Sequence, residues 1–113
     1  MNPQLLAALI LVESGGNDFA RGRHGEIGAL QIRAAVVADV NHHFGTRYAH
    51  SQMTNRAAAA DVCTKYVAIY ATEARLGRPA TVRDIARIWN GGPDGWRRRA
   101  TISYANKVEQ QLR

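Results

Sequence analysis

The stretch that decides the fold runs from Leu5 to Gln31 and reads LLAALILVESGGNDFARGRHGEIGALQ. In the first part of this stretch, apolar side chains recur at helical spacing on the face that ends in Glu13. This pattern predicts a helix with one buried face. The apolar residues of this face are Leu6, Leu9 and Ile10. Gly15 and Gly16 end the helix. One carboxylate therefore stands where a buried helix meets a glycine-rich loop.

The rest of the chain predicts more helices and almost no strand. Helical spacing of apolar residues predicts helices over 34–40, 54–76, 81–89 and 104–112. The helix over 54–76 is the longest, and we expect it to be a scaffold without chemistry. Only Ile27 to Ile32 could pair as short strands. We therefore expect an all-α or mainly α fold, with an ordered glycine-rich loop or short hairpin after the first helix.

Two helix boundaries carry local signals. Gly77 is a good C-terminal cap for the helix over 54–76. Thr81 and Asp84 form the Thr-x-x-Asp pattern of a capping box and predict the start of the next helix. We expect this helix to turn four side chains inward, namely Val82, Ile85, Ala86 and Trp89.

The composition is that of one soluble globular domain. The chain has 113 residues, of which 46% are hydrophobic and 21% charged, so we expect a single domain over residues 1–113. The longest apolar run, Leu5 to Val12, is too short to span a membrane. It is not expected to be a signal peptide, because no basic region precedes it and Glu13 interrupts it before any small-residue cleavage site. Cys63 is the only cysteine, which excludes an intrachain disulfide and favours a buried thiol. No Cys/His spacing predicts a metal site, and no cofactor is expected.

Glu13 is the first candidate for chemistry. A carboxyl group at the end of an apolar helix face is partly desolvated, and desolvation raises its pKa toward the range that a general acid needs near neutral pH. A carboxylate at a helix C-terminus is also unfavourable against the helix dipole, so some other role should account for it. The alternative is a polar helix end or a structural carboxylate pair.

Two separated motifs then point to a family. Glu13-Ser14 is followed by Gly25, Gly28 and Leu30-Gln31, and a second motif, Trp89-Asn90-Gly91-Gly92, comes near the other end. Together they resemble the soluble (SLT) type of lytic transglycosylases, relatives of goose-type lysozyme. The family pattern is Glu-Ser, a glycine-bearing loop, Gly-Leu-Met-Gln, and later Ala-Tyr-Asn-x-Gly. The resemblance extends from about residue 4 to residue 108. It implies a mainly α, lysozyme-like helical domain with the glycine-rich loop or short hairpin at its active-site cleft.

The resemblance implies a peptidoglycan-cleaving enzyme with Glu13 as its single catalytic acid/base. Glu13 would protonate the β-1,4 bond between N-acetylmuramic acid and N-acetylglucosamine, and then accept a proton from the muramic C6 hydroxyl as a 1,6-anhydro ring closes. Ser14 would support the helix end and the loop. The other implied substrate-binding residues are Gln31, Trp89, Asn90 and Tyr104, with Tyr104 orienting Glu13. The glycines of the loop would let the backbone approach the sugar chain closely.

The chain departs from the family pattern at four positions. Trp89 replaces a tyrosine, and its indole can stack on a sugar but cannot donate as a phenol does. Leu30 replaces a methionine, and Gly22 stands where a serine is common. Arg33 replaces a second methionine and could face a carboxylate of the substrate or solvent.

Glu26 leaves the chemistry open. If it faced Glu13, it could position a water molecule, and the enzyme would be a hydrolytic muramidase with two carboxylates. We favour the alternative of a solvated loop carboxylate.

Charge leaves a second alternative open. The net charge of +6 implies attraction to polyanions, among them nucleic acid and an anionic cell wall. The run Arg97 to Arg99 could belong to a small nucleic-acid-binding helical domain, but no base-reading helix is recognisable, so we expect no nucleic-acid partner and favour a solvated turn. A lysozyme-like domain that binds the wall without cutting it is a third alternative.

The expected partner is the glycan strand of peptidoglycan, and the expected site of action is the bacterial cell wall. We expect a monomer without a transmembrane segment. The small domain without a signal peptide resembles phage or prophage lytic enzymes. Delivery would then depend on a phage particle, a holin or a segment outside this sequence.

Overall fold

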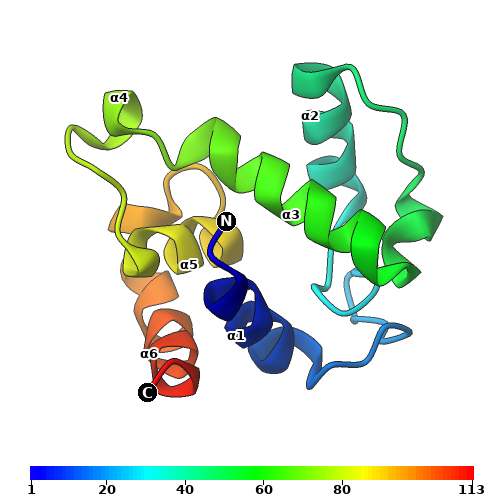
Figure 1. The fold of residues 1–113 in the computed structure, drawn as a ribbon, viewed down its shortest axis with the longest axis horizontal. Coiled ribbons are helices and arrows are strands. Elements are labelled where there is room, and N and C mark those ends of the chain that lie inside the picture. The colour runs from blue at the N-terminus through cyan, green and yellow to red at the C-terminus, as the bar shows by residue number, and fades with distance from the viewer. The chain divides into compact units, whose positions relative to one another are not determined.

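The computed structural model describes residues 1–113 and is mainly helical, as predicted (Figure 1). It contains no strand, only two isolated antiparallel bridges that pair Arg21 with Ile27 and Ile27 with Ile32. None of the helices has the length and apolar character needed to cross a membrane. In chain order the helices are α1 (Pro3–Ser14), α2 (Ala34–Phe44), η1 (His50–Thr54), α3 (Arg56–Tyr70), α4 (Glu73–Leu76), α5 (Val82–Gly91), η2 (Gly95–Arg97), η3 (Arg99–Thr101) and α6 (Ile102–Gln111).

The chain forms two compact units, which are described separately here. The loop unit comprises residues 10–66 and includes the end of α1, the glycine-rich loop, α2, η1 and most of α3. The terminal unit comprises residues 1–9 and 67–113. A single domain over residues 1–113 stays a prediction.

Helix α1 forms where the sequence predicts it. Pro3 is its first residue, where a missing N–H costs nothing, and the Asn2 side chain accepts a hydrogen bond from the Gln4 N–H at 2.8 Å. Leu9 and Ile10 are buried. Gly15 then adopts a φ of +66°, which a glycine reaches without strain, and α1 ends.

The loop unit is built around a short bridged turn. Ile27 and Ile32 exchange two backbone hydrogen bonds of 3.0 Å, so the segment that was expected to be able to pair does form bridges, although no strand develops. Both side chains are buried, as are Leu30 and Met53. A ring nitrogen of His50 lies 2.6 Å from the Ile32 carbonyl oxygen and joins η1 to the turn. The bridged turn is therefore anchored to the core from both sides.

The prediction of one helix over 54–76 was wrong. Helix α3 ends at Tyr70, and a separate turn, α4, begins after Thr72. The Thr72 hydroxyl accepts a hydrogen bond from the Arg75 N–H at 3.3 Å, as an N-cap does, and the Arg75 guanidinium donates to the Tyr70 carbonyl oxygen at 2.9 Å. These two contacts favour a new helix start over continuation. Gly77 ends α4 in the left-handed conformation, as predicted for the end of this segment.

The terminal unit packs α5 against α6 and η2, and Figure 1 shows α5 above α6 (yellow and orange-red). The capping box of Thr81 and Asp84 is confirmed. The inward face of α5 differs from the prediction, because Val82, Ile85 and Trp89 are only half-buried. The fully buried residues of this helix are Asp84, Ala86 and Ile88. Asp84 can be buried because its carboxylate is paired.

Asp84 is held by two neighbours. Its carboxylate accepts hydrogen bonds from Arg78 Nη2 at 2.9 Å and from the Thr81 backbone N–H at 2.8 Å. The side chain is only 5% exposed, so solvent screens these contacts weakly. The hydrogen bond from Arg78 is the main cause that lowers the pKa of Asp84 from 3.8 to about 2.

Protonation of Asp84 at acid pH should therefore lower the free energy of unfolding. Because the folded-state pKa lies below the unfolded one, the contribution is present above about pH 4 and is lost as the pH falls from about 4 to about 2. The shift corresponds to about 2 kcal/mol. We expect Asp84→Asn to lose about that much free energy of unfolding at neutral pH and to flatten its dependence on acid pH. Urea unfolding at several pH values measures both.

Asp94 provides the matched control. It also pairs with arginines, at 3.3 Å to Arg75 and 3.2 Å to Arg97, but its side chain is 40% exposed. Asp94→Asn should therefore change the free energy of unfolding by less than about 1 kcal/mol. Equal losses in the two variants would contradict the role of burial at Asp84.

Candidate active site

Glu13 lies in the last turn of α1 and is half-buried. On α3 of the same unit, Cys63 is fully buried. Burial raises the pKa of the Cys63 thiol, and the negative charge of Glu13 raises it further. Cys63 is thus a neutral, unreactive core residue, as predicted. Glu13 itself is half-buried and therefore lies at the border between the core and solvent.

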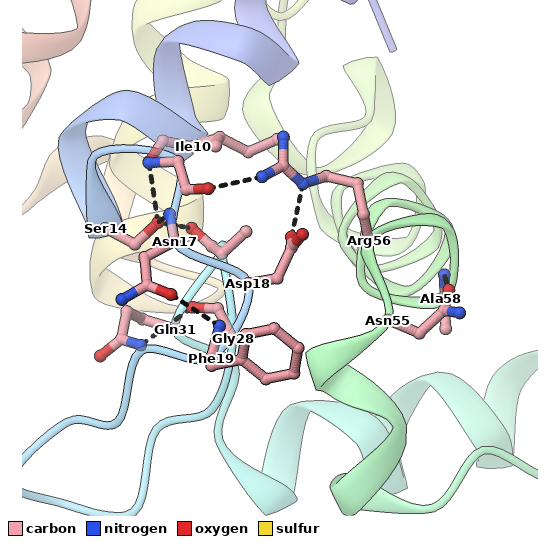
Figure 2. A network of polar contacts seen from close by, with 12 residues as sticks. Ile10, Ser14, Asn17, Asp18, Phe19, Gly28, Gln31, Asn55, Arg56 and Ala58 are labelled. Atoms are coloured by element: carbon pink, nitrogen blue, oxygen red, sulfur yellow. Dashed lines mark hydrogen bonds and ion pairs between the residues drawn. The ribbon is translucent and has the colours of Figure 1, made fainter.

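Ser14 joins the end of α1 to the bridged turn. Its hydroxyl donates a hydrogen bond to the Ala29 carbonyl oxygen at 2.8 Å. The Oγ of Ser14 in turn accepts hydrogen bonds from the backbone N–H groups of Gly16 and Asn17, at 3.2 and 3.1 Å (Figure 2). These contacts support the helix end and the loop, which is the structural role expected for this residue. A direct contact of Ser14 with substrate stays a prediction.

Arg56 fixes the start of the loop from the other side. From the first residue of α3, its Nε donates to Asp18 at 2.6 Å and its Nη2 donates to the Gly16 carbonyl oxygen at 2.7 Å (Figure 2). The Asn17 side chain accepts the N–H of Phe19 at 2.9 Å in the same network. The helix that carries Arg56 was expected to be a scaffold, and its contact with the loop was not predicted. No local signal could have revealed it, since 38 residues separate Arg56 from Asp18.

Gly28 is required by packing inside the protein. Its φ is +90°, and a β-carbon on it would lie 1.9 Å from the Met53 carbonyl oxygen. The expectation that the loop glycines serve close approach to a sugar therefore needs correction at this position. Gly15, Gly16 and Gly25 have positive φ values and open space around them, so turn geometry accounts for these three.

Gln31 closes the bridged turn in a strained conformation. It is the one non-glycine residue with a positive φ, at +51°. Its Nε2 donates to the carbonyl oxygens of Ala20 and Gly28, at 3.1 and 2.9 Å, and these contacts hold the turn in place. Both amide hydrogens are thereby used, and the orientation of the amide follows from its two carbonyl partners. The amide oxygen is the part of Gln31 that can accept a ligand's hydrogen bond.

Glu26 is bound within the loop. Its carboxylate accepts the His24 N–H at 2.8 Å and lies 3.7 Å from the Arg33 guanidinium, while the side chain is 19% exposed. Hydrogen bonds from the backbone N–H groups of Glu26 itself and His24, with the charge of Arg33, lower the pKa of Glu26. The group is therefore anionic at neutral pH and unsuited to donate a proton. Arg33 faces this carboxylate and solvent.

Gly22 brings Glu26 and Gln31 together. A β-carbon on Gly22 would lie 2.5 Å from Glu26 Oε1 and 2.8 Å from Gln31 Oε1. The bare Cα therefore leaves room for both oxygens.

The second sequence motif lies in the terminal unit. Trp89 and Asn90 occupy the last turn of α5, and Tyr104 lies in the first turn of α6, which packs against α5. Trp89 and Tyr104 are half-buried and Asn90 is exposed. A β-carbon on Gly91 would lie 2.4 Å from the Thr101 methyl group, so a glycine is needed for the close contact there. Gly92 ends α5 with a φ of +86°.

Comparison with known proteins decides the family. A model of the transglycosylase SLT domain matches residues 1–108. The chain belongs to the transglycosylase SLT domain family. No curated protein sequence matches it.

The SLT domain family consists of lytic transglycosylases, which are lysozyme-like glycosidases that cleave peptidoglycan and act on the cell wall. The chain is accordingly an enzyme of this class, and peptidoglycan is its substrate. The matched range contains both motifs, from Glu13-Ser14 to Trp89-Asn90. Within residues 1–113 of this SLT domain, no group of three or more His, Cys, Asp or Glu side chains could hold a metal ion.

Proposed function

We propose that this SLT domain cleaves peptidoglycan by transglycosylation with Glu13 as its only catalytic carboxyl group. The bond cleaved is the β-1,4 bond between N-acetylmuramic acid and N-acetylglucosamine. The observation that carries the proposal is the position of Glu13, half-buried at the end of α1 where the core meets solvent, and next to a residue that anchors the bridged turn. Such a border favours a carboxyl group that can hold and release a proton.

The chemistry needs no second protein carboxylate. Protonated Glu13 donates its proton to the glycosidic oxygen as the bond from that oxygen to the muramic C1 breaks. The muramic C6 hydroxyl oxygen then bonds to C1, and its proton passes to the Glu13 carboxylate. The 1,6-anhydro ring is thus formed, no water is consumed, and Glu13 regains its acid form.

The state of Glu26 supports this single-carboxylate route. Hydrolysis would require a base that activates water opposite the leaving group. Glu26 is anionic, but its carboxylate already accepts a backbone N–H and faces Arg33. The alternative, a hydrolytic muramidase that uses Glu13 and Glu26 together, is tested by the same product analysis.

The remaining roles follow the family resemblance. We propose that Gln31 and Asn90 form hydrogen bonds with the sugar or its N-acetyl group, that Trp89 stacks on a sugar face, and that Tyr104 orients Glu13. Ser14 keeps the helix end in place. The phage or prophage origin, the delivery by particle or holin and the monomeric state also stay proposals.

Product analysis tests the reaction. Purified peptidoglycan is digested with the protein, and the released muropeptides are identified by mass spectrometry. We expect 1,6-anhydromuramic ends, which are lighter by one water than the reducing ends that hydrolysis leaves. A digest with reducing ends alone would contradict transglycosylation and favour the two-carboxylate alternative. Isotopically labelled water provides the control, because only hydrolysis incorporates its oxygen.

A further inference from the structure

The arginine loop, residues 94–101 of the terminal unit, combines exposed positive charge with a tightly held backbone. It contains η2 and η3, which are joined at Arg98. Arg97, Arg98 and Arg99 are all exposed. From the sequence this run is expected to be a solvated turn, and its exposure agrees with that expectation. The backbone beneath the arginines is nevertheless more constrained than a solvated turn requires.

Thr101 and Arg87 hold this backbone. The Thr101 hydroxyl, on a residue that is 2% exposed, lies 2.7 Å from the Gly95 carbonyl oxygen and 2.8 Å from the Arg98 carbonyl oxygen. Arg87 donates from Nε to the same hydroxyl and from Nη2 to the Arg98 carbonyl oxygen, each at 2.8 Å. Gly95 packs so closely that a β-carbon on it would lie 2.0 Å from the Arg87 carbonyl oxygen. The loop is therefore fixed before any ligand arrives.

The charges on the loop are only partly neutralised. Arg97 pairs with Asp94 at 3.2 Å, and its guanidinium lies 5.6 Å from the centre of the Trp96 ring. Arg78 lies over the same ring at 5.9 Å, and its own charge is paired with Asp84. Arg98 and Arg99 form no ion pair with the protein. Two adjacent guanidinium groups on a fixed backbone thus remain available to an anion.

We propose that the arginine loop binds the carboxylates of the acidic stem peptides of peptidoglycan, through Arg98 and Arg99. The proposal rests on the proposed function, because it takes peptidoglycan as the polymer that the enzyme cleaves. Guanidinium groups bind carboxylates through paired, charge-assisted hydrogen bonds. Because the backbone is already ordered, binding costs only the entropy of the two side chains and none for ordering the loop. Acidic stem peptides carry such carboxylates beside the glycan strand that the enzyme cleaves.

The test measures binding without cleavage. In the Glu13→Gln background, the full chain is bound to insoluble peptidoglycan that either keeps its stem peptides or has lost them to an amidase. Arg98→Gln with Arg99→Gln removes the two free charges. The control, Lys107→Gln with Arg113→Gln, removes two exposed charges that also have no ion pair, from the later part of α6 and the C-terminus. Both pairs of substitutions lower the net charge equally.

We expect the Arg98/Arg99 variant to bind peptide-bearing peptidoglycan about tenfold more weakly at low salt, as the loss of two exposed charge-assisted contacts implies. Its binding to peptide-free glycan should equal that of the parent, and the control should bind both materials normally. The difference should disappear near 1 M salt, where charges are screened within about 3 Å. Amidation of the stem carboxylates should weaken binding of the unmodified arginine loop by the same factor, and this arm requires no substitution in the terminal unit.

Three results would overturn the proposal. The first is an equal loss on peptide-free glycan or in the charge-matched control, which would indicate net charge alone. The second is a loss that requires phosphate-containing wall polymers and disappears after acid extraction of the wall. The third is arginine-dependent binding to DNA that is tighter than binding to the wall. No part of this test depends on cleavage. A negative binding result would therefore not contradict the single-carboxylate reaction. Conversely, reducing ends in the product analysis would not contradict binding by the arginine loop.

Discussion

Replacing Glu13 with glutamine should abolish peptidoglycan cleavage while the protein stays folded. The amide has the shape of the carboxyl group but cannot donate the proton that the glycosidic oxygen needs or accept one from the C6 hydroxyl. General acid and base catalysis contributes about 10²- to 10⁴-fold each, so the rate of product release should fall by at least about 10²-fold. Turbidity loss of a peptidoglycan suspension measures the rate, and circular dichroism with urea unfolding reports the fold.

Glu26→Gln is the control that makes this result specific. Glu26 lies in the same unit and carries a negative charge, but its contacts are a backbone N–H and Arg33. We expect this variant to keep activity within about threefold of the parent, since surface-loop contacts of this kind contribute little. If Glu26→Gln were as inactive as Glu13→Gln, the single-carboxylate mechanism would fail. If Glu13→Gln kept full activity, the assignment of the acid itself would fail.

The largest loss of stability is expected from Gly28→Ala. The substitution adds a β-carbon at a φ of +90° and places it 1.9 Å from the Met53 carbonyl oxygen, which belongs to backbone and cannot rotate away. Left-handed strain costs about 1 kcal/mol and overpacking about 1 to 3 kcal/mol more, so the free energy of unfolding should fall by about 3 kcal/mol. Activity should fall too, because Gly28 belongs to the turn that binds Ser14 and Gln31.

Gly16→Ala separates the two causes. Gly16 has nearly the same φ, +92°, but a β-carbon on it would meet nothing within 4 Å. In this variant the free energy of unfolding should fall by about 1 kcal/mol, because backbone strain is its only cause. Urea unfolding of both variants measures the difference that is due to the Met53 contact. Equal losses would show that the turn moves to accept the alanine, and that packing does not account for the glycine.

Features encoded by neighbouring residues could be predicted from the sequence. Helix α1 follows from apolar spacing with a glycine stop, and the start of α5 follows from Thr81 and Asp84. The segment from Ile27 to Ile32 was also expected to be able to pair, and its two end residues form a bridge. In each case the sequence pattern and the structure it predicts lie within a few residues of each other, where hydrogen-bond geometry allows few backbone conformations.

Features that depend on distant contacts could not be predicted. The alanine-rich pattern over 54–76 favours one helix, but the chain breaks after Tyr70, where the Arg75 guanidinium also contacts the Pro93 carbonyl oxygen and Asp94. The Arg56 contact with Asp18, the fit of Gly28 against Met53 and the contact of Arg87 with Thr101 all join residues that only the fold brings together. The positions of the candidate site residues along the chain were recognisable, whereas their hydrogen-bond partners were not.

The bare Cα of Gly22 has a consequence for inhibitor design. The oxygens of Glu26 and Gln31 gather around it, and both amide hydrogens of Gln31 are already used by the protein. The two side-chain oxygens nearest to this Cα are therefore both hydrogen-bond acceptors. Compounds that present an N–H or O–H group there should gain affinity, whereas ethers, ketones and carboxylates should lose it. A matched pair of ligands that differ by one such group would measure this preference directly.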